Sequence, residues 1–338
     1  MTELKEITSL RVGGPAQHFV SAGTEEEIIA AINGAGDHNI LIVGAGTNLL
    51  VADAGFEGVV IHISNNKLTA EVDACSGATL TIGAGENWDE FVALTLKRGF
   101  AGLETLSGIP GTVGAAPIQN IGAYGHEVSE FITRVRTYDR VEKALRTFTH
   151  SECEFGYRTS VFKKNPGRYV VLEVQFQLRR GEMTTEITYP ELAKKLGVEV
   201  GGKVLTERAR AAVLELRASK GMLLDSNDCD TWSAGSFFVN PIVSEAVASQ
   251  LPNDAPRWKL ADGKVKLSAA WLIENSGISK GAEHGGARVS TKHVLALTNA
   301  GKASATDIAT LARLIQDAVV MKFGIKLEPE VNLVGLSL

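Results

Sequence analysis

IPGTVGAAPIQNIGAYG occupies residues 109–125, and more than half of these residues are glycine, alanine or proline. Its only bulky polar side chains are those of Gln119, Asn120 and Tyr124. A connecting loop rarely needs so many small residues in a row, whereas a loop whose backbone closely approaches a large flat ligand does. The stretch therefore favours a ligand-binding segment over a plain structural loop.

The residues before this stretch alternate short apolar runs with capped helices. Residues 40–43 and 59–63 are apolar runs of the kind that form buried strands. Thr24 and Asn87 are each followed by a glutamate three residues later, which predicts the start of a helix at each position.

The residues after the stretch predict further strands and helices. Residues 169–178 alternate polar and apolar side chains, as in a strand with one buried face. Residues 207–220 predict a helix with Ala211, Leu214 and Ala218 on its apolar face. Ser268 and Thr306 are candidate helix caps. Residues 326–334 predict a final strand. Mixed β–α units and runs of strand together predict an α+β fold.

Length and composition restrict the class of protein. At about 150 residues per domain, a chain of 338 residues is expected to form two or three domains. Hydrophobic residues make up 44% and charged residues 22%, which excludes a disordered chain. A formal net charge of −5 argues against a basic nucleic-acid-binding domain.

Cysteine usage and the N-terminus indicate the cellular compartment. Cys75, Cys153 and Cys229 lie far apart without metal-binding spacing, so we expect reduced cysteines and no metal site. The chain begins without an apolar signal segment, and no apolar run reaches the roughly 18 residues of a membrane helix. The expectation is a soluble, cytoplasmic protein.

A second glycine-rich segment, GAGTN at residues 44–48, follows a predicted strand. Small residues let backbone amides converge on an anion, so phosphate binding and a plain tight turn are equally good interpretations. The segment is not a dinucleotide-binding fingerprint, because Leu49 stands where the third glycine belongs. No Gly-Lys-Ser/Thr follows, which excludes a P-loop.

Three further motifs carry isolated polar residues. Arg158 lies in GYRTS, where the alternative is an ordinary surface charge. Ser236 lies in GSFFVNP, as a turn former or a buried proton donor, and the lack of a G-x-S-x-G elbow disfavours a hydrolase nucleophile. Glu330 lies in LEPEV, as a polar strand entry or a carboxylate delivered to a site.

Taken in order, these segments resemble the UDP-N-acetylenolpyruvoylglucosamine reductase family, flavoenzymes of bacterial peptidoglycan precursor synthesis. The resemblance spans nearly the whole chain and is carried by SLRVGG (9–14), GAGTN (44–48), the 109–125 stretch, GYR (156–158), GSFF (235–238) and LEPE (327–330). Tyr189 in ITYPEL matches the tyrosine on the substrate-covering loop of the family's longer form.

The resemblance implies a fold and two cofactors. The expected organisation begins with an FAD-binding domain of the vanillyl-alcohol-oxidase type, whose two lobes are residues 1–70 and 71–214. A C-terminal α+β substrate-binding domain follows at residues 215–325. The last strand, at residues 326–338, is expected to return to the active site. FAD is expected without a covalent link, since neither glycine-rich segment contains a histidine or cysteine to attach it. NADPH is expected as co-substrate.

The resemblance also assigns binding residues. The FAD contacts of the family map onto Gly44, Gly46, Thr47, Asn48, Ile109, Pro110, Gly111, Gly114, Ala115, Ala116, Gln119, Asn120, Gly122, Ala123 and Tyr124. The substrate contacts map onto Tyr189, Arg217, Lys220, Asn240 and His293. His293 stands where some members of the family have glutamine.

Three matched residues fit reduction of an enolpyruvyl group. Arg158 would hold and polarise the substrate carboxylate. Glu330, if protonated, would hydrogen-bond the same carboxylate. Ser236 would deliver a proton to the carbon that develops negative charge. The expected substrate and co-substrate are both small molecules, and no obligatory protein partner is expected.

Three other functions compete with this interpretation. A flavin oxidase on the same fold would not need Ser236 and Glu330. A non-catalytic nucleotide-binding protein would not need the intact set of Arg158, Ser236 and Glu330. A purely structural module leaves the glycine-rich residues 109–125 without a reason.

Overall fold

The computed structural model describes residues 2–73 and 77–338, so Cys75 lies outside the described residues. Contacts divide the chain into two units. Unit 1 contains Gln17–Ala45 and Glu57–Leu223, and unit 2 contains Thr2–Ala16, Gly46–Phe56 and Leu224–Leu338. Each unit is therefore assembled from discontinuous segments of the chain.

A small sheet with one helix opens unit 1. Its strand order is β1-β4-β2, from β1 (Ala16–Ala22), β2 (Ile40–Val43) and β4 (Phe56–Ile63), and β2 runs parallel to β4. The helix expected after Thr24 is α1 (Glu25–Gly34), and the Thr24 hydroxyl accepts a 3.2 Å hydrogen bond from the Glu27 amide. The Glu27 carboxylate accepts a hydrogen bond from the amide of Gly23, the residue before the cap, whereas in a full capping box it would accept from the amide of Thr24.

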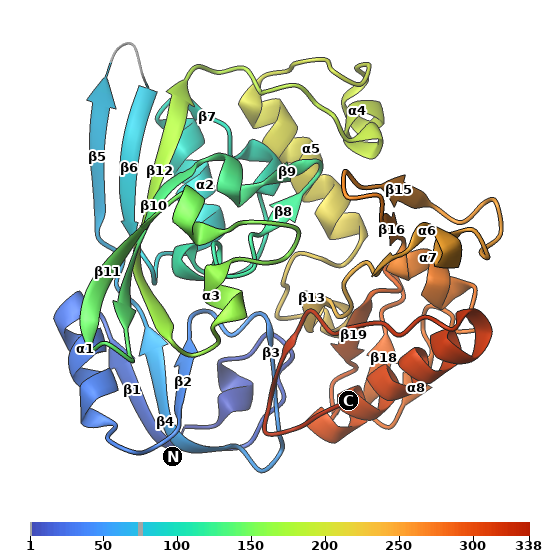
Figure 1. The fold of residues 1–338 in the computed structure, drawn as a ribbon, viewed down its shortest axis with the longest axis horizontal. Coiled ribbons are helices and arrows are strands. Elements are labelled where there is room, and N and C mark those ends of the chain that lie inside the picture. The colour runs from blue at the N-terminus through green and yellow to red at the C-terminus, as the bar shows by residue number, and fades with distance from the viewer. Residues whose placement is uncertain (1, 74–76) are drawn as a thin grey trace. The chain divides into compact units, whose positions relative to one another are not determined.

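A larger antiparallel sheet forms the main body of unit 1 (Figure 1). Its order is β11-β10-β12-β6-β5, with β7 also paired to β12. The strands are β5 (Leu68–Asp73), β6 (Gly77–Gly83), β7 (Phe100–Ala101), β10 (Ile132–Asp139), β11 (Ala144–Thr149) and β12 (Tyr169–Arg180). The alternation predicted for 169–178 is confirmed, because Val170, Leu172, Val174, Phe176 and Leu178 are all buried.

An aromatic cluster joins helix α2 (Trp88–Lys97) to this sheet. Asn87 caps α2 as predicted, accepting a 3.0 Å hydrogen bond from the Glu90 amide. The rings of Phe91 and Phe176 lie 5.1 Å apart, and those of Trp88 and Phe176 lie 6.1 Å apart. Burial of each such side chain stabilises the fold by about 1.5–3 kcal/mol, so these contacts hold α2 firmly against the sheet.

The remaining elements of unit 1 are short except for one helix. They are β8 (Gly122–Ala123), β9 (His126–Glu127), α3 (Val161–Lys164), α4 (Pro190–Leu196) and α5 (Thr206–Ser219). Helices α4 and α5 share an apolar cluster that contains Leu192, Leu196, Ala209 and Val213. The helix predicted over 207–220 is therefore confirmed as α5, although the buried side chains lie on a different face from Ala211 and Ala218, which are exposed.

Unit 2 contains one long helix and three small sheets. Its elements are β3 (Leu49–Val51), β13 (Ser233–Ser236), β14 (Ile242–Val243), α6 (Glu245–Ala248), β15 (Arg257–Lys259), β16 (Val265–Leu267), α7 (Ala269–Glu274), β17 (Glu283–His284), β18 (Ala287–Val289), β19 (Ala296–Asn299), α8 (Ala305–Phe323) and β20 (Asn332–Val334). The strand orders are β13-β19-β18-β17, β14-β16-β15 and β20-β3. Ser268 caps α7 as predicted, through the Trp271 amide.

Two sequence predictions in unit 2 need correction. The cap of α8 is Ser304, not Thr306, and it forms a capping box with Asp307. The Thr306 hydroxyl instead donates to Asp53. The strand predicted over 326–334 is shorter, because only Asn332–Val334 pairs in a ladder, parallel to β3.

Candidate functional site

The two glycine-rich segments of the sequence touch inside unit 1. A Cβ atom added to Gly44 would lie 2.6 Å from the Thr112 hydroxyl oxygen, so only glycine permits this approach. Gly114 is equally constrained, since an added Cβ would lie 2.4 Å from the Cβ atom of Ala84. Part of the glycine content therefore serves the chain's own packing, and that packing brings residue 44 to the 109–125 stretch.

The surface of these segments fits a flavin. Ala45 and Ala115 are exposed, while Ile109, Pro110 and Gly111 are half-buried. The side chains of these five residues are small or apolar, as close approach to a flat ring requires. The other candidate FAD residues of this stretch are the buried Gly114, Ala116 and Asn120 and the half-buried Gln119, Gly122, Ala123 and Tyr124.

Tyr124 is displayed at the tip of a tight hairpin. Ala123 pairs with His126 across β8 and β9, and the two residues between them, Tyr124 and Gly125, have φ of 50° and 91°. Two positive φ angles are the signature of a type I′ turn, for which glycine at the second position is favoured. Burial is the main reason why the pKa of Tyr124 is raised to about 12, so its hydroxyl stays protonated near neutral pH.

Arg158 is anchored on the 109–125 stretch. Its guanidinium donates to the carbonyl oxygens of Asn120 at 3.2 Å and Gly122 at 2.8 Å. Gly156 and Thr159 exchange two backbone hydrogen bonds of 3.1 Å around it, so Arg158 sits in a tight turn with φ of 51°. A side chain in the left-handed region costs of order 1 kcal/mol, and such strain is concentrated at functional sites.

Asn120 holds the turn of Arg158 in place. Its side-chain amide donates to Glu127 at 2.6 Å and to the Gly156 carbonyl at 3.1 Å, and its oxygen accepts from the Ser129 amide at 3.1 Å. Because both donor hydrogens are used within the protein, the side chain of Asn120 acts here as a positioning group.

A polar network fixes Gly108, directly before the stretch. Its amide donates to Asp89 at 2.6 Å, and its carbonyl accepts from Arg217 at 3.0 Å. The Arg210 guanidinium donates two hydrogen bonds, of 2.6 and 2.7 Å, to the Asp89 carboxylate. Burial would raise the pKa of Asp89, but the hydrogen bonds from Arg210 and Gly108 and the charges of Arg210 and Arg217 outweigh it and lower the pKa. Arg217, predicted as a substrate contact, thus holds the backbone, and burial lowers its pKa.

The other substrate residues predicted in unit 1 gather beside Tyr124. The rings of Tyr124 and Tyr189 meet edge to face at 5.6 Å. The Lys220 ammonium lies 5.9 Å from the centre of the Tyr124 ring and forms a 2.6 Å ion pair with Glu191. An exposed tyrosine, a lysine and an aromatic hairpin tip are suited to hold a nucleoside and its diphosphate.

Ser236 and Glu330 are neighbours in unit 2. Ser236 ends β13 after a bulge, where Gly235 has φ of 74°, and it pairs with Ala296 of β19. The next residue, Phe237, accepts a 2.8 Å hydrogen bond from the Glu330 amide. The bulge sets the direction of Ser236, because an extra residue re-aims the side chains of a strand.

Asn48 is tied to the backbone of Glu330. Its side-chain nitrogen lies 3.3 Å from the Glu330 carbonyl oxygen. Its own carbonyl accepts a 3.1 Å hydrogen bond from the Asn332 amide. Gly46, with φ of 61°, packs against the backbone of Ile7, and Thr47 lies half-buried in the same turn. These three candidate FAD residues thus belong to unit 2, whereas Gly44 belongs to unit 1.

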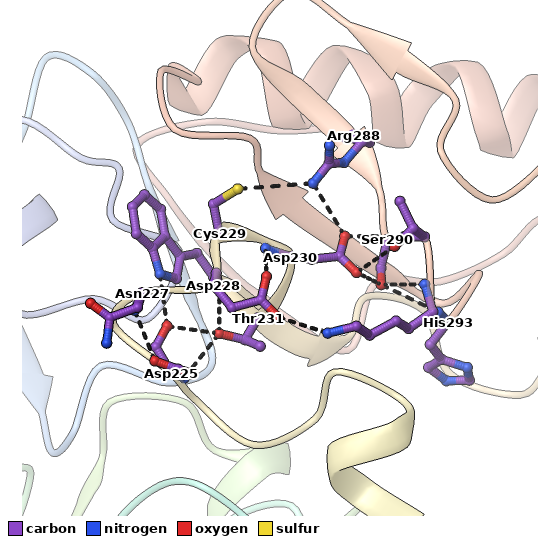
Figure 2. Close-up of polar contacts among 12 residues, drawn as sticks. Asp225, Asn227, Asp228, Cys229, Asp230, Thr231, Arg288, Ser290 and His293 are labelled. Carbon is purple, nitrogen blue, oxygen red and sulfur yellow. Dashed lines mark hydrogen bonds and ion pairs between the residues drawn. The ribbon is translucent and has the colours of Figure 1, made fainter.

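The remaining substrate candidates, Asn240 and His293, are both half-buried. The Asn240 side-chain oxygen accepts a 2.9 Å hydrogen bond from the Ala269 amide at the start of α7. Figure 2 shows the loop of His293 organised by Asp230, with the imidazole pointing away from that carboxylate. Asp230 accepts hydrogen bonds from Ser290 at 3.0 Å and from the Thr291 amide and hydroxyl at 3.1 and 2.9 Å.

Cysteines and possible metal ligands show no constellation in the part of the chain that the structure describes. Cys153 is buried, and burial raises the pKa of its thiol to about 12. Within residues 2–73 and 77–338, no group of three or more His, Cys, Asp or Glu side chains could hold a metal ion. None of the helices described is both long and apolar enough to span a membrane.

Sequence reasoning missed Asp89, Arg210, Glu191 and Asp230. Asp89 and Arg210 are 121 residues apart, and nothing in either local segment indicates that they meet. Asp89 lies in the first turn of α2, where an acidic residue is expected simply for its interaction with the helix dipole. These residues act through contacts that exist only in the folded chain.

Comparisons with known proteins show which family the chain resembles. Residues 16–147 match the family model of the FAD binding domain, and residues 227–334 match that of the UDP-N-acetylenolpyruvoylglucosamine reductase C-terminal domain. Two enzymes named UDP-N-acetylenolpyruvoylglucosamine reductase, from Cutibacterium acnes and Streptomyces coelicolor, are 51% and 45% identical over 99% of this chain and 90% of their own lengths.

A solved structure gives the same result for the fold. UDP-N-acetylenolpyruvylglucosamine reductase from Thermus caldophilus is 26% identical, with a TM-score of 0.68 over 98% of this chain and 97% of its own. The expected α+β fold, with an FAD-binding domain followed by the C-terminal domain of the family, is confirmed. The chain belongs to the UDP-N-acetylenolpyruvoylglucosamine reductase family.

Proposed function

We propose that this chain reduces the enolpyruvyl group of UDP-N-acetylglucosamine enolpyruvate to the lactyl ether of UDP-N-acetylmuramate, with NADPH as reductant and FAD as cofactor. Its family membership supports an oxidoreductase of peptidoglycan precursor synthesis. The observation that carries the proposal is the anchoring of Arg158 by the carbonyl groups of Asn120 and Gly122. This contact holds a cation for the substrate carboxylate on the segment proposed to bind the flavin.

The residues that would hold FAD are Gly44, Gly46, Thr47, Asn48 and the candidate FAD contacts within residues 109–125. The bound cofactor would supply hydride transfer between NADPH and the enolpyruvyl double bond. The protein's part is to bind, to orient and to move a proton.

Arg158 would polarise the carboxylate of the substrate. Negative charge develops on that carboxylate as hydride adds to the conjugated double bond, so a guanidinium beside it stabilises the transition state more than the ground state. Glu330 would donate a hydrogen bond to the same carboxylate in its protonated form. The hydrogen bond from the Glu330 amide to Phe237 supports this pairing of roles, since it keeps Glu330 next to Ser236 in the fold.

Ser236 would complete the reaction by protonating the carbon that bears the ether oxygen. A neutral hydroxyl is a weak acid, so this transfer requires a strongly basic enolate as acceptor. The enolate produced by hydride addition meets that requirement.

The nucleotides would be bound by Tyr189, Lys220 and His293, with Arg217 and Asn240 in support. NADPH and the UDP-sugar each carry a diphosphate, so one cationic site containing Lys220 can serve both in turn. Arg217 and Asn240 would act by holding backbone groups, since both are bonded to them here.

The domain boundaries are part of the same proposal. Residues 1–70 and 71–214 would bind FAD, 215–325 would cover the substrate, and 326–338 would return to the active site. The pairing of β20 with β3 supports a return of the last strand, and it joins residues near the C-terminus to Leu49–Val51. We also propose that the enzyme works in the cytoplasm, where NADPH is made, and without an obligatory protein partner; cell fractionation and the mass of the native enzyme test both points.

An anaerobic visible spectrum tests the proposed reaction. The flavin band should bleach on addition of NADPH and return only when UDP-N-acetylglucosamine enolpyruvate is added. Bleaching without recovery would indicate an oxidase or another acceptor. A protein without a flavin band after addition of FAD would overturn the cofactor assignment and the mechanism.

A further inference from the structure

The ion pair between Lys220 and Glu191 occupies the proposed diphosphate site. The two charged atoms lie 2.6 Å apart, and the side chains are 32% and 40% exposed. Glu191 belongs to the first turn of α4, two residues after Tyr189, and Lys220 caps the C-terminal end of α5. Figure 1 shows these two helices within the same part of the molecule.

The packing of α4 on α5 does not depend on this ion pair. The two helices share a buried apolar cluster that includes Leu192, Leu196 and Val213. Arg208 of α5 also donates to the carbonyl oxygen of Leu196. Surface ion pairs add little to such a contact, so stability alone gives Glu191 no strong reason to lie beside Lys220.

The surroundings of the pair point to a ligand site. Lys220 lies over the ring of Tyr124, and Tyr189 meets the same ring edge to face. The charge of Glu191 is among the causes that raise the pKa of Tyr124, so the carboxylate acts electrostatically on this cluster. Glu191 therefore places one negative charge where an anionic ligand of Lys220 must bind.

We propose that Glu191 is an internal counter-ion of Lys220 that competes with the diphosphate groups of NADPH and of the UDP-sugar. This inference rests on the proposed function, because it takes Lys220 as the diphosphate ligand. An entering diphosphate carries negative charge, so it repels Glu191 and displaces that carboxylate from the ammonium.

The competition has a functional consequence for successive binding of two nucleotides. A site whose cation already has a partner binds each diphosphate more weakly than a bare cation would. Weaker binding favours release of NADP⁺ before the sugar nucleotide enters. Glu191 would thus set the affinity of both ligands together, without contact with the reacting atoms.

The variant Glu191→Gln tests the proposal by the direction in which its ligand affinity changes. Removing the competing charge should lower the dissociation constants of NADP⁺ and of the UDP-sugar about two- to fivefold, the range expected for loss of one exposed ion pair. If Glu191 instead oriented Lys220 for its ligand, the same substitution would weaken binding. The affinity of the variant should also fall more steeply with salt concentration, because the site then carries an uncompensated positive charge.

Glu215→Gln is the matched control. Glu215 forms a 2.6 Å ion pair with Lys195, and this pair also joins α5 to α4. Loss of that pair should leave both dissociation constants unchanged. When Glu191→Gln is added to the Lys220→Ala variant, the affinity should not rise above that of Lys220→Ala alone, because the cation for which Glu191 competes is absent.

Isothermal titration calorimetry of the FAD-loaded enzyme with NADP⁺ and with UDP-N-acetylglucosamine enolpyruvate provides the measurement. The measurement needs no turnover. An enzyme that binds NADP⁺ but does not reduce the sugar nucleotide would overturn the proposed function, whereas its binding affinities would still test the role of Glu191. Unchanged or weaker binding by Glu191→Gln would overturn the counter-ion proposal. A gain that persists without Lys220 would overturn it as well.

Discussion

The amide of Glu330 donates a 2.8 Å hydrogen bond to the carbonyl oxygen of Phe237. This bond places the C-terminal LEPE motif next to the residue that follows Ser236, although 93 positions separate the two bonded residues. A second hydrogen bond, from the Val239 amide to the Glu328 carbonyl at 3.0 Å, extends the pairing. The proposed proton donor and the proposed carboxylate partner are therefore held by backbone bonds within one unit.

Ser236→Ala should separate the two half-reactions. The variant keeps the backbone pairing of Phe237 and should be reduced by NADPH at nearly the rate of the wild type. Reoxidation by the enolpyruvyl substrate should slow by about 10²- to 10⁴-fold, the usual contribution of a positioned acid. Anaerobic stopped-flow absorbance of the flavin measures both rates, with Ser244→Ala, at the cap of α6, as the control. Equal losses in the two half-reactions would contradict the assignment.

Arg158→Lys should lower kcat/KM about 10- to 100-fold. A lysine keeps the charge but loses the planar fork that can bind carbonyl groups and a carboxylate together. The expected loss corresponds to one charge-assisted hydrogen bond of about 1.5–3 kcal/mol. Steady-state kinetics at saturating NADPH measure it, and Arg146→Lys on the exposed strand β11 is the control. Wild-type kinetics in Arg158→Lys would remove Arg158 from the proposed site.

Asp89→Asn should destabilise the enzyme by about 1–3 kcal/mol at pH 7, because Arg210 and the Gly108 amide lose a charged acceptor. The pKa of Asp89 is lowered from 3.8 in the folded state. A depressed folded-state pKa contributes stability above the pKa of the unfolded chain, and that stability is lost as the pH falls through the folded-state value. The difference between wild type and variant should therefore shrink below about pH 4. Urea unfolding between pH 7 and pH 3 measures this, and a gap independent of pH would refute it.

Ser304→Ala should cost about 1 kcal/mol of stability, the typical value for loss of a helix cap. The Ser304 hydroxyl accepts the Asp307 amide at 3.0 Å, and the Asp307 carboxylate accepts the Ser304 amide at 2.9 Å. Thr306→Ala is the matched comparison and should cost at most about 0.5 kcal/mol, since its hydroxyl bonds Asp53 at an exposed position. Thermal unfolding of both variants decides which residue caps α8; a larger loss in Thr306→Ala would favour the sequence-based prediction.

Local sequence determined the elements whose signals are local. The caps at Thr24, Asn87 and Ser268 form as predicted, because a cap needs only a side-chain oxygen and an amide two or three residues away. The strand over 169–178 forms because its alternation matches the pleat of a sheet with one buried face. Family membership was also readable from the sequence, since its motifs are contiguous.

Tertiary structure decided how distant segments combine. Gly44 meets Thr112, Asp89 meets Arg210, and Glu330 meets Phe237 through contacts between residues far apart in the chain. No local pattern encodes such a partner, because each segment is compatible with many neighbours until the core is packed. The same reason explains the misplaced face of α5: helical spacing allows several faces, and only packing against α4 and the rest of unit 1 chooses the buried one.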